Sequence, residues 1–330
     1  MDIYKKYRLW WIIAIFLALC GCVQNVKIPA EETFNVYKVQ STKDDPATHF
    51  APVFLTYDYQ NNYNRIGRPS GSYDENGQEH IYVDVNNSVI YYQVQNFSTD
   101  KDEYTNYIYR VHFPFIPFSL IPFHLSAGKN VGLIIIVTVD TGNRPVLVTA
   151  VHTCGCYLAI IPTTHLSVDS FPENWKEEPK IIYGERLPWR LEYTGKDNPK
   201  ILVHLRPGVH RVMNLEIIEE YDLNNRRDFR KIISPLAQMN ELETIPIDGK
   251  TTSFYYKEGL LAGHVKGSIK IWESIFLSPI SLDLFVGTDK VYGDTKVTRN
   301  PFYTSLKPWN RNSSDMWNFT RFLKFWGWRL

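Results

Sequence analysis

The stretch VGLIIIVTVDTGNRPVLVTAVHTCGCYLAIIPT, residues 131–163, contains the longest β-like apolar runs in the chain. Val131–Val139 and Pro145–His152 are both rich in Val, Ile and Thr, which favour strands. The polar residues between them include Gly142 and Asn143, which tolerate the positive φ of a chain reversal. The stretch therefore predicts a β-hairpin. Because the first run is apolar throughout its centre, both faces of the hairpin should be covered, as in the middle of a sheet.

Three residues with metal-binding or redox-active side chains follow at the end of the second run. Side chains alternate between the two faces of a strand, so His152, Cys154 and Cys156 should point to the same side. The two cysteines are the only ones after residue 22. The pattern leaves three interpretations open: a local disulfide, a metal site, or two small buried hydrophobic residues beside a strand-end histidine.

A disulfide between Cys154 and Cys156 requires a bend in the chain. Residues two apart in an extended strand are separated by about 6.6 Å, at the upper end of the Cα range that a disulfide spans. Gly155 lies between the two cysteines and permits the bend, because glycine has no Cβ. Such a bridge is expected to be strained and more easily reduced than a structural disulfide.

The metal interpretation assigns His152, Cys154 and Cys156 as three ligands of zinc or copper, which imidazole and thiolate groups favour. The sequence has no second cysteine cluster to complete a four-ligand site. A fourth ligand would come from one of the histidines His112, His124, His165, His204, His210 and His264. Apart from this zinc or copper, the sequence indicates no cofactor.

The rest of the chain repeats the pattern of short apolar runs and turns. Aromatic residues make up 15% of the sequence, which favours β structure. We therefore expect a mainly β protein, an antiparallel β-sandwich or barrel-like domain with one or two short helices. One helix is predicted at Met316–Trp326, where Ser313, Ser314 and Asp315 can cap its start. Its aromatic side chains would either pack on the domain or lie at a membrane interface.

Three further segments carry local predictions. His80–Val85 and Val89–Val94 flank three turn-forming residues and predict a second hairpin. The apolar spacing of residues 229–236 predicts a helix that is interrupted by Pro235. Residues 263–277 predict a strand.

A proline-rich aromatic segment, FPFIPFSLIPFHL, lies before the central hairpin. Pro114, Pro117 and Pro122 are expected to exclude regular sheet or helix, so the segment should be an extended crossing. Its apolar side chains would either pack in the core or form an exposed surface for a partner or an acyl chain.

The N-terminal residues have the features of a secretory signal. Lys5, Lys6 and Arg8 precede Leu9–Leu19, an apolar run of eleven residues. This run is too short to span a bilayer but suits the apolar region of a signal peptide. An uncleaved signal anchor is the alternative.

The apolar run ends in Leu19-Cys20-Gly21-Cys22, which resembles the lipobox of bacterial lipoproteins. In that class of proteins the chain is cleaved before the cysteine, which becomes lipidated. The resemblance implies that Cys22 is the mature N-terminus, that it carries a diacyl or triacyl anchor, and that the lipid bilayer is a partner. Val23 follows, with no Asp at that position, and in enteric-type sorting this implies the outer membrane, facing the periplasm.

These features divide the chain into four expected segments. Residues 1–21 are the lipoprotein signal peptide, residues 22–50 a lipidated N-terminus and polar tether, residues 51–295 a β-rich domain, and residues 296–330 a C-terminal segment with the aromatic helix.

The charge balance argues against nucleic acid as a partner. Of 36 basic and 35 acidic residues, cleavage after residue 21 removes three and one, which leaves 33 and 34 and a net charge of −1. Acylation of Cys22 would leave Cys154 and Cys156 as an even pair in an oxidising compartment. This count favours the disulfide over the metal site.

The sequence contains no motif of a known catalytic class, such as GxSxG, HExxH, a P-loop or GxGxxG at a strand-to-helix turn. Two hypotheses follow. The first is a non-enzymatic envelope lipoprotein, a β-rich binding or assembly module with an envelope protein as its partner. The second is a periplasmic thiol-redox or metal-handling protein that uses His152, Cys154 and Cys156.

Overall fold

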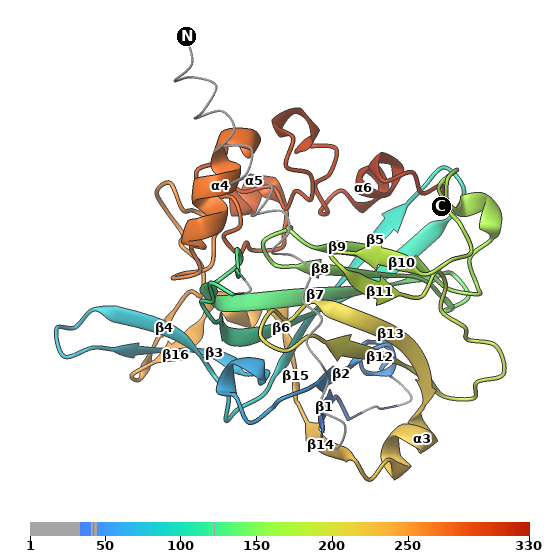
Figure 1. Cartoon of the computed structure of the whole chain (residues 1–330), viewed down its shortest axis with the longest axis horizontal. Helices are drawn as coiled ribbons and strands as arrows, with labels where there is room; N and C mark the ends of the chain where they lie inside the picture. The colour runs from blue at the N-terminus through green and yellow to red at the C-terminus, as the bar shows by residue number, and fades with distance from the viewer. Residues whose placement is uncertain (1–33, 41, 43–44, 122) are drawn as a thin grey trace.

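The computed structural model describes residues 34–40, 42, 45–121 and 123–330 (Figure 1). It is mainly β, with several sheets arranged like a sandwich and a C-terminal helix, which confirms the predicted fold class. The predicted signal peptide, the lipobox and Cys22 lie outside the described residues. Within those residues, no helix is long and apolar enough to cross a membrane.

The largest sheet has six strands in the order β15-β5-β6-β7-β8-β9 (Figure 1). Neighbouring strands are antiparallel, except that β15 and β5 are parallel. The strands are Leu236–Gln238 (β15), Ile90–Ser98 (β5), Glu103–Ile116 (β6), Gly128–Asp140 (β7), Pro145–His152 (β8) and Leu158–Pro162 (β9).

The predicted hairpin of the central stretch is confirmed by β7 and β8, which pair along their lengths. The Asp140 side chain accepts hydrogen bonds from the backbone N–H groups of Gly142 and Arg144, each at 2.9 Å, and so closes the turn. Asn143 adopts the positive φ of 57° that the reversal requires.

Both faces of the six-stranded sheet are buried at its central strands β7 and β8, as the unbroken apolar run predicts. Ile135 and its same-face neighbours pack against the five-stranded sheet described next. Ile134 and Ile136 point the other way and pack beneath segments from the C-terminal third of the chain, including Phe254 and Phe322. The six-stranded sheet therefore lies between two clusters of the hydrophobic core, and a third cluster, which includes Val36 and Leu202, lies on the five-stranded sheet.

The other sheets are smaller. A five-stranded mixed sheet has the order β13-β12-β2-β1-β14, a four-stranded sheet has the order β17-β16-β3-β4, and β10 and β11 form a hairpin. The strands are Phe34–Lys38 (β1), Val53–Thr56 (β2), Arg68–Tyr73 (β3), Glu79–Asp84 (β4), Lys180–Ile182 (β10), Glu185–Leu187 (β11), Pro199–Leu205 (β12), Val212–Glu219 (β13), Phe229–Ile233 (β14), Ile245–Ile247 (β16) and Lys250–Thr252 (β17).

The described residues form five α-helices, where the sequence indicated one or two. The helices are Pro46–His49 (α2), Glu220–Asn225 (α3), Ile271–Ser281 (α4), Thr295–Thr298 (α5) and Phe319–Phe325 (α6). Short 3-10 helices lie at Asn62–Asn64, Val168–Ser170, Met239–Glu243 and Pro308–Asn310.

The C-terminal helix α6 lies within the range predicted for it. The Asn318 side chain caps its start by accepting a hydrogen bond from the backbone N–H of Arg321 at 3.1 Å. Phe319, Phe322 and Leu323 are buried in the core between α6 and the six-stranded sheet. The helix therefore uses its main apolar face to pack on the domain.

The second predicted hairpin was wrong. The strands β4 and β5 form where expected, but β4 pairs with β3, and β5 pairs with β6 and β15. The Asp84 side chain accepts a hydrogen bond from the backbone N–H of Asn86 at 3.0 Å and shapes a turn that connects two different sheets. Burial of Val89 and Ile90 in the core then decides the partner of β5.

The predictions for two later segments were also wrong. Residues 229–236 form the strand β14 and the start of β15, because β-branched Ile232 and Ile233 suit the parallel pairing of β14 with β1. Residues 263–277 form a loop and then the helix α4. The exposed residues of α4 include Ile271, Ile275 and Ile280, whereas its buried residues are Glu273 and Ser281, so its sequence lacks the pattern of an amphipathic helix.

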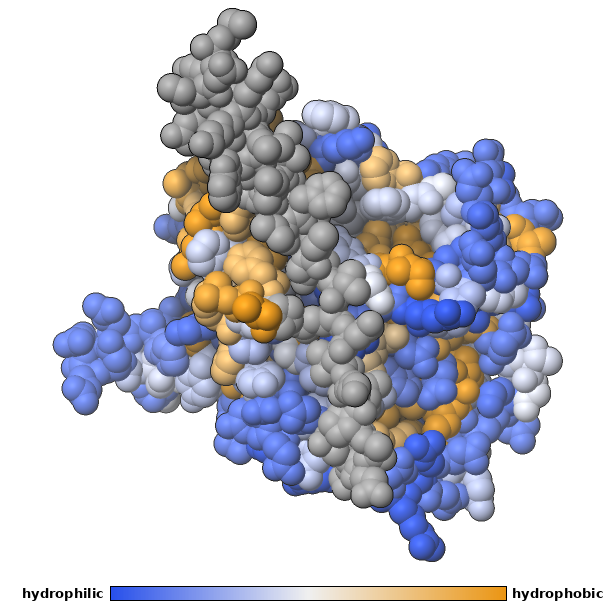
Figure 2. Space-filling model, in the orientation of Figure 1, coloured by the Kyte–Doolittle hydropathy of each residue, from blue (hydrophilic) through white to orange (hydrophobic). Residues whose placement is uncertain are grey.

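The proline-rich segment is more regular than predicted. The strand β6 continues through Pro114, whereas its pairing with β5 ends at Arg110. The N–H group that proline lacks is therefore not needed for a hydrogen bond between β6 and β5. Phe113 is buried, whereas Phe118 and Leu120 are exposed, so the segment has both a core part and a surface part. The third proline, at position 122, lies outside the described residues. Figure 2 shows apolar side chains gathered on the surface over α4.

We expect Ile134→Ala and Ile135→Ala to lower the free energy of unfolding by similar amounts, each about 2–5 kcal/mol, because each leaves a cavity in a packed core. Val94→Ala, on an exposed position of β5, is the control and should change it by less than about 0.5 kcal/mol. Urea unfolding monitored by tryptophan fluorescence measures all three. A small effect at only one isoleucine would contradict tight packing on that face.

Candidate functional site

Cys154 and Cys156 form a disulfide with a Cα–Cα distance of 5.3 Å. The turn between β8 and β9 holds them, with Gly155 at a φ of 79°. The backbone N–H of Gly155 donates to the carbonyl of His152 at 2.7 Å. A Cβ at Gly155 would overlap the carbonyl oxygen of Tyr303, so glycine is required both for the bend and for the approach of the C-terminal segment.

The two cysteines of the bridge differ in burial. Cys154 is buried, and its Sγ accepts a hydrogen bond from the backbone N–H of Cys156 at 3.3 Å. Cys156 is half-buried. A reagent in solvent therefore reaches the bridge from the Cys156 side.

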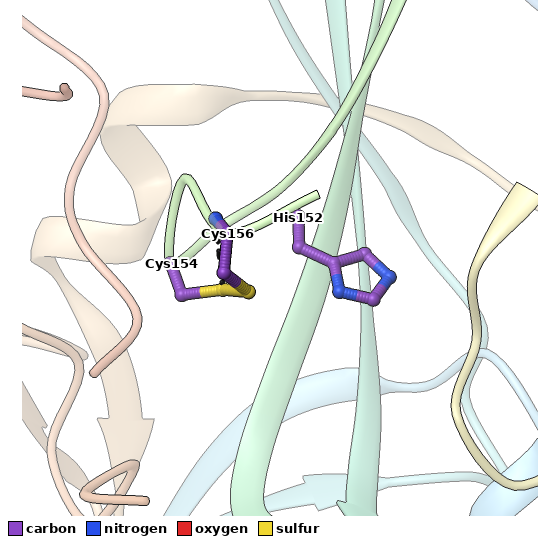
Figure 3. Close-up of side chains that lie close together, drawn as sticks. All are labelled: His152, Cys154 and Cys156. Carbon is purple, nitrogen blue, oxygen red and sulfur yellow. Dashed lines mark hydrogen bonds between the residues drawn. A yellow bond between two sulfur atoms is a disulfide. The ribbon is translucent and has the colours of Figure 1, made fainter. Parts of the chain in front are cut away.

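The imidazole of His152 lies beside the disulfide (Figure 3). One ring nitrogen of His152 and the sulfur atoms of Cys154 and Cys156 lie within 4.8 Å of one another. Burial, with the nearby charge of Lys270, holds the pKa of His152 well below its usual value, so the ring is neutral at physiological pH. Its Nε2 atom is buried and has no hydrogen-bond partner among the described residues.

A cavity of about 140 Å³ adjoins the disulfide. Its walls come from segments that are far apart in the sequence: the β8–β9 turn, α4, and the C-terminal segment around Tyr303. His152, both cysteines, Glu273 and Leu277 are among the lining residues. The cavity therefore places an imidazole and a carboxyl group around one disulfide.

Glu273 in the first turn of α4 is the buried acid of this cavity. Its Oε2 atom has no hydrogen-bond partner among the described residues. Burial raises the pKa of Glu273 to about 7, with a smaller contribution from Asp289 and opposing effects of Lys270 and Lys290. Glu273 can therefore both give and accept a proton near neutral pH.

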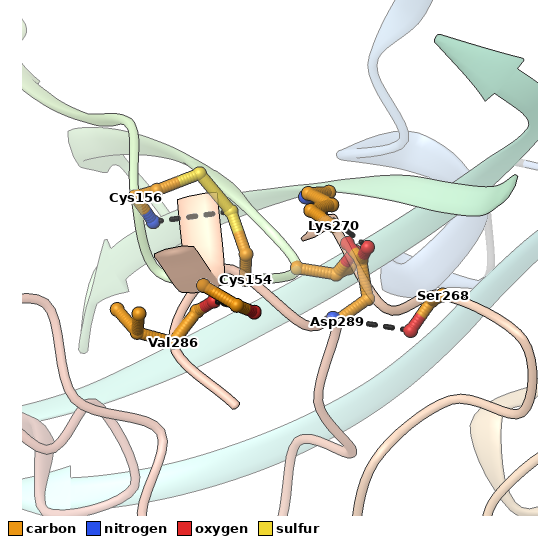
Figure 4. The surroundings of a disulfide bond; sticks show 8 residues. Cys154, Cys156, Ser268, Lys270, Val286 and Asp289 are labelled. Atoms are coloured by element: carbon orange, nitrogen blue, oxygen red, sulfur yellow. Dashed lines mark hydrogen bonds and ion pairs between the residues drawn. A yellow bond between two sulfur atoms is a disulfide. The ribbon is translucent and has the colours of Figure 1, made fainter. Parts of the chain in front are cut away.

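An ion pair without solvent access lies next to the disulfide (Figure 4). The Lys270 ammonium is 3.2 Å from the Asp289 carboxylate, and both side chains are almost completely buried. The Thr153 hydroxyl, from the turn that carries the cysteines, donates a hydrogen bond to Asp289. The backbone N–H of Asp289 donates to the Ser268 hydroxyl at 3.2 Å. These bonds connect the cysteine turn to the segment around α4.

A second buried cation lies nearby. The Lys290 ammonium is 3.3 Å from the ring centroid of Tyr303, and no hydrogen-bond acceptor for it exists among the described residues. Burial lowers the pKa of Lys290 to about 7. Arg110 from β6 donates to the Lys290 carbonyl at 3.0 Å and to Nε2 of His112 at 3.0 Å. Charged groups thus extend from the cavity into the core.

Cys156 also borders a second cavity, of about 350 Å³, on the other side of the turn. Its walls include Trp175, Trp326 and Trp328. The Lys180 ammonium lies over the Trp175 ring at 4.0 Å from the centroid. This cavity offers an aromatic surface next to the accessible sulfur.

The other histidines considered as a fourth ligand do not join the cysteine cluster in the described part of the chain. His112 pairs with Arg110, His204 contacts Tyr57 and Glu216, and His264 contacts Asn300. Three histidines remain. His210 stacks on Phe113, His165 lies against Tyr193, and His124 lines the same cavity as the disulfide.

Sequence reasoning missed Glu273, Lys270, Asp289, Lys290 and Tyr303. These residues lie more than a hundred positions from the cysteines, and no spacing connects them to the turn. The sequence contains one weak signal for Glu273, which is the one charged residue in the otherwise uncharged segment IWESIFLSPIS.

The chain matches no protein-family model, and comparison with curated proteins and with solved structures found no match. The function is therefore argued from the geometry of the site.

We expect Glu273→Gln to change how stability depends on pH. The folded protein holds the Glu273 proton up to about pH 7, whereas the unfolded chain loses it near pH 4.5, so the folded state binds more protons in between. The stability that this group contributes below pH 4.5 is lost as the pH rises through 7. The free energy of unfolding of the variant should therefore rise relative to wild type by about 3 kcal/mol across this range.

Urea unfolding between pH 4.5 and pH 7.5 measures this difference. Glu75→Gln is the matched control, because Glu75 is exposed and the substitution removes the same charge. An equal effect of both substitutions would assign the change to net charge and not to the buried carboxyl group.

Proposed function

We propose that the protein is a lipid-anchored envelope protein whose Cys154–Cys156 pair exchanges its disulfide with thiols of partner proteins. The observation that carries this proposal is the position of Cys156, half-buried between two cavities, one of which holds a buried carboxyl group with a pKa near neutrality. Reactive disulfides are accessible and have a proton donor nearby, whereas structural ones are buried and inert.

The exchange begins when a thiolate of the partner attacks Sγ of Cys156. An S–S bond forms between the partner and Cys156, the Cys154–Cys156 bond breaks, and its electron pair remains on Cys154. A second partner thiolate then attacks the partner sulfur of the mixed disulfide and releases Cys156. Two electrons and two protons move from the partner dithiol to the cysteine pair, and the partner keeps a disulfide.

The surroundings of the disulfide suit each of these steps. Glu273 lies in the same cavity and can protonate the Cys154 thiolate as it leaves. The neutral ring of His152 adds no charge beside the sulfur atoms. The cavity lined by Trp175 and Trp328 provides an apolar surface for the residues that flank a partner thiol.

A purely structural role explains the bridge poorly. The chain-entropy model assigns a loop of three residues a stabilisation of about 2 kcal/mol, less than the roughly 3 kcal/mol for a loop of 15 residues. The turn is already held by the backbone hydrogen bond between Gly155 and His152 and by the contact of Thr153 with Asp289. The bridge therefore adds little to a segment that is already fixed.

Metal handling is the second candidate, and the clustering of three ligand atoms within 4.8 Å supports it. The two roles exclude each other at any one moment, because the disulfide removes both thiolates from coordination. Reduction would supply the thiolates of Cys154 and Cys156, and the neutral His152 would complete a three-ligand zinc or copper site.

We expect the native protein to be reduced by dithiothreitol and reoxidised by oxidised glutathione without unfolding. Cys154→Ser should form a mixed disulfide with glutathione at Cys156, whereas Cys156→Ser should react much more slowly, because Cys154 is buried. Alkylation followed by intact mass spectrometry measures both reactions, and circular dichroism checks the fold. A bridge that is reduced only in denaturant would refute the exchange proposal.

Two further measurements separate the alternatives. Zinc or copper that is retained by the reduced protein under native conditions, and lost on denaturation, would favour the metal site. The double variant Cys154→Ser, Cys156→Ser cannot exchange disulfides. A wild-type phenotype of cells that carry only this variant would therefore favour a binding or assembly module.

The anchor is tested separately. We expect the wild-type protein to incorporate a labelled fatty acid in cells and Cys22→Ser to incorporate none, because the acyl groups are attached through this cysteine. Cys20→Ser is the matched control and should keep the label, since serine is also small at that position. Label on Cys22→Ser, or its absence from wild type, would contradict the lipobox interpretation.

A further inference from the structure

The helix α4 carries an exposed apolar surface that the disulfide site does not use. Its only charged residue, Glu273, points into the protein. Its outer side presents Ile271, Ile275, Phe276 and Ile280, all of them exposed. A helix on the surface of a soluble domain normally has polar or charged residues on its outer side. The outer side of α4 is apolar instead.

A loop that contains Phe118–Ile121 and Phe123 extends this surface. Phe118 stacks on Trp272 with ring centroids 6.2 Å apart, and Phe123 contacts both Trp272 and Phe276. Leu120 in the same loop is exposed. The loop and helix thus form one continuous apolar surface, part of which is visible over α4 in Figure 2.

Basic residues lie in the segments that follow α4 in the sequence. Leu282 and Leu284, which are exposed, continue it beyond the end of α4, and the Arg311 guanidinium donates to the carbonyl of Ser281 at the last turn. Exposed basic residues follow in the adjoining C-terminal segments, namely Lys296, Arg299 and Lys307. Of the acidic residues there, Asp283 accepts a hydrogen bond from Tyr303, and Asp294 caps α5.

We propose that the surface formed by α4, residues 118–121 and Phe123 docks on an anionic lipid bilayer. Isoleucine, leucine and phenylalanine would enter the boundary between headgroups and acyl chains, Trp272 suits that boundary, and the basic residues would face the headgroups. No span across the membrane is involved. The proposal places α4 parallel to the membrane plane.

The expected lipid anchor at Cys22 agrees with a bilayer as the partner of this surface. Eleven residues separate Cys22 from Phe34 at the start of β1, and a chain of this length reaches at most about 40 Å. A domain held within that distance meets the bilayer repeatedly, so even weak affinity of one surface orients it. This step rests on the proposed lipid anchor, whereas the chemistry of the surface does not.

Docking would also bring the disulfide close to the membrane. Phe123 and Leu277, which flank this surface, line the cavity beside Cys154 and Cys156. A thiol in a membrane-bound or membrane-proximal partner would then be the nearest substrate.

The experiment uses the chain from Val23 onward, secreted with a different cleavable signal, because it lacks the lipid-bearing cysteine and keeps all described residues. We expect it to float with vesicles of phosphatidylethanolamine and phosphatidylglycerol and to bind neutral phosphatidylcholine vesicles more weakly. Ile275→Glu should reduce partitioning by about tenfold or more. Binding of this anchor-free chain tests the surface independently of acylation at Cys22.

Ile233→Glu is the matched control, since Ile233 in β14 is 54% exposed and Ile275 is 56% exposed. This control should bind vesicles as wild type does, and equal thermal unfolding of the three proteins would establish that each is folded. Brominated acyl chains should quench the Trp272 fluorescence, measured as the difference between wild type and Trp272→Phe. Absence of vesicle binding, an equal loss in both glutamate variants, or dimerisation through this surface seen by light scattering would overturn the proposal.

Discussion

Burial of both faces of the six-stranded sheet is the constraint on which the rest of the structure depends. Adjacent residues of β7, such as Ile134 and Ile135, must both be removed from water, and a single packed layer can cover only one of them. The five-stranded sheet covers one face, and the C-terminal third of the chain must therefore cover the other. This covering brings α4 and the segment around Tyr303 against the turn that carries Cys154 and Cys156.

The same covering buries groups that are costly to bury. Lys270, Asp289, Glu273 and Lys290 all lose their water, and the ion pair between the first two offsets only part of that cost. Apolar side chains of similar volume would stabilise this core as well or better. Glu273 and Lys290 both have a pKa of about 7, and Glu273 lines the cavity beside the disulfide. Groups of this kind are typical of sites that transfer protons, so Glu273 supports the proposal of chemistry at the disulfide.

Local signals in the sequence predicted local structure. The hairpin of β7 and β8 and the bend at Gly155 depend on neighbouring residues, whose turn chemistry is visible in the sequence. The pairing of β5 with β6 depends instead on which strand offers the longer buried partner, and Glu273 meets the cysteines only after the sheet has been covered. Non-local contacts of this kind have no period or spacing in a single sequence.

The helix α4 shows why neither the site nor the apolar surface was predicted from the sequence. An amphipathic helix is recognised by an apolar inner side and a polar outer side. In α4 the arrangement is reversed: the Glu273 carboxyl group is inside and the isoleucines are outside. Each departure is costly in water for an isolated soluble domain, through desolvation of Glu273 on one side and exposure of Ile271, Ile275 and Ile280 on the other. The proposed proton-transfer site would account for the first departure and the proposed lipid surface for the second. The two explanations are independent in chemistry, yet one helix fixes the distance between them.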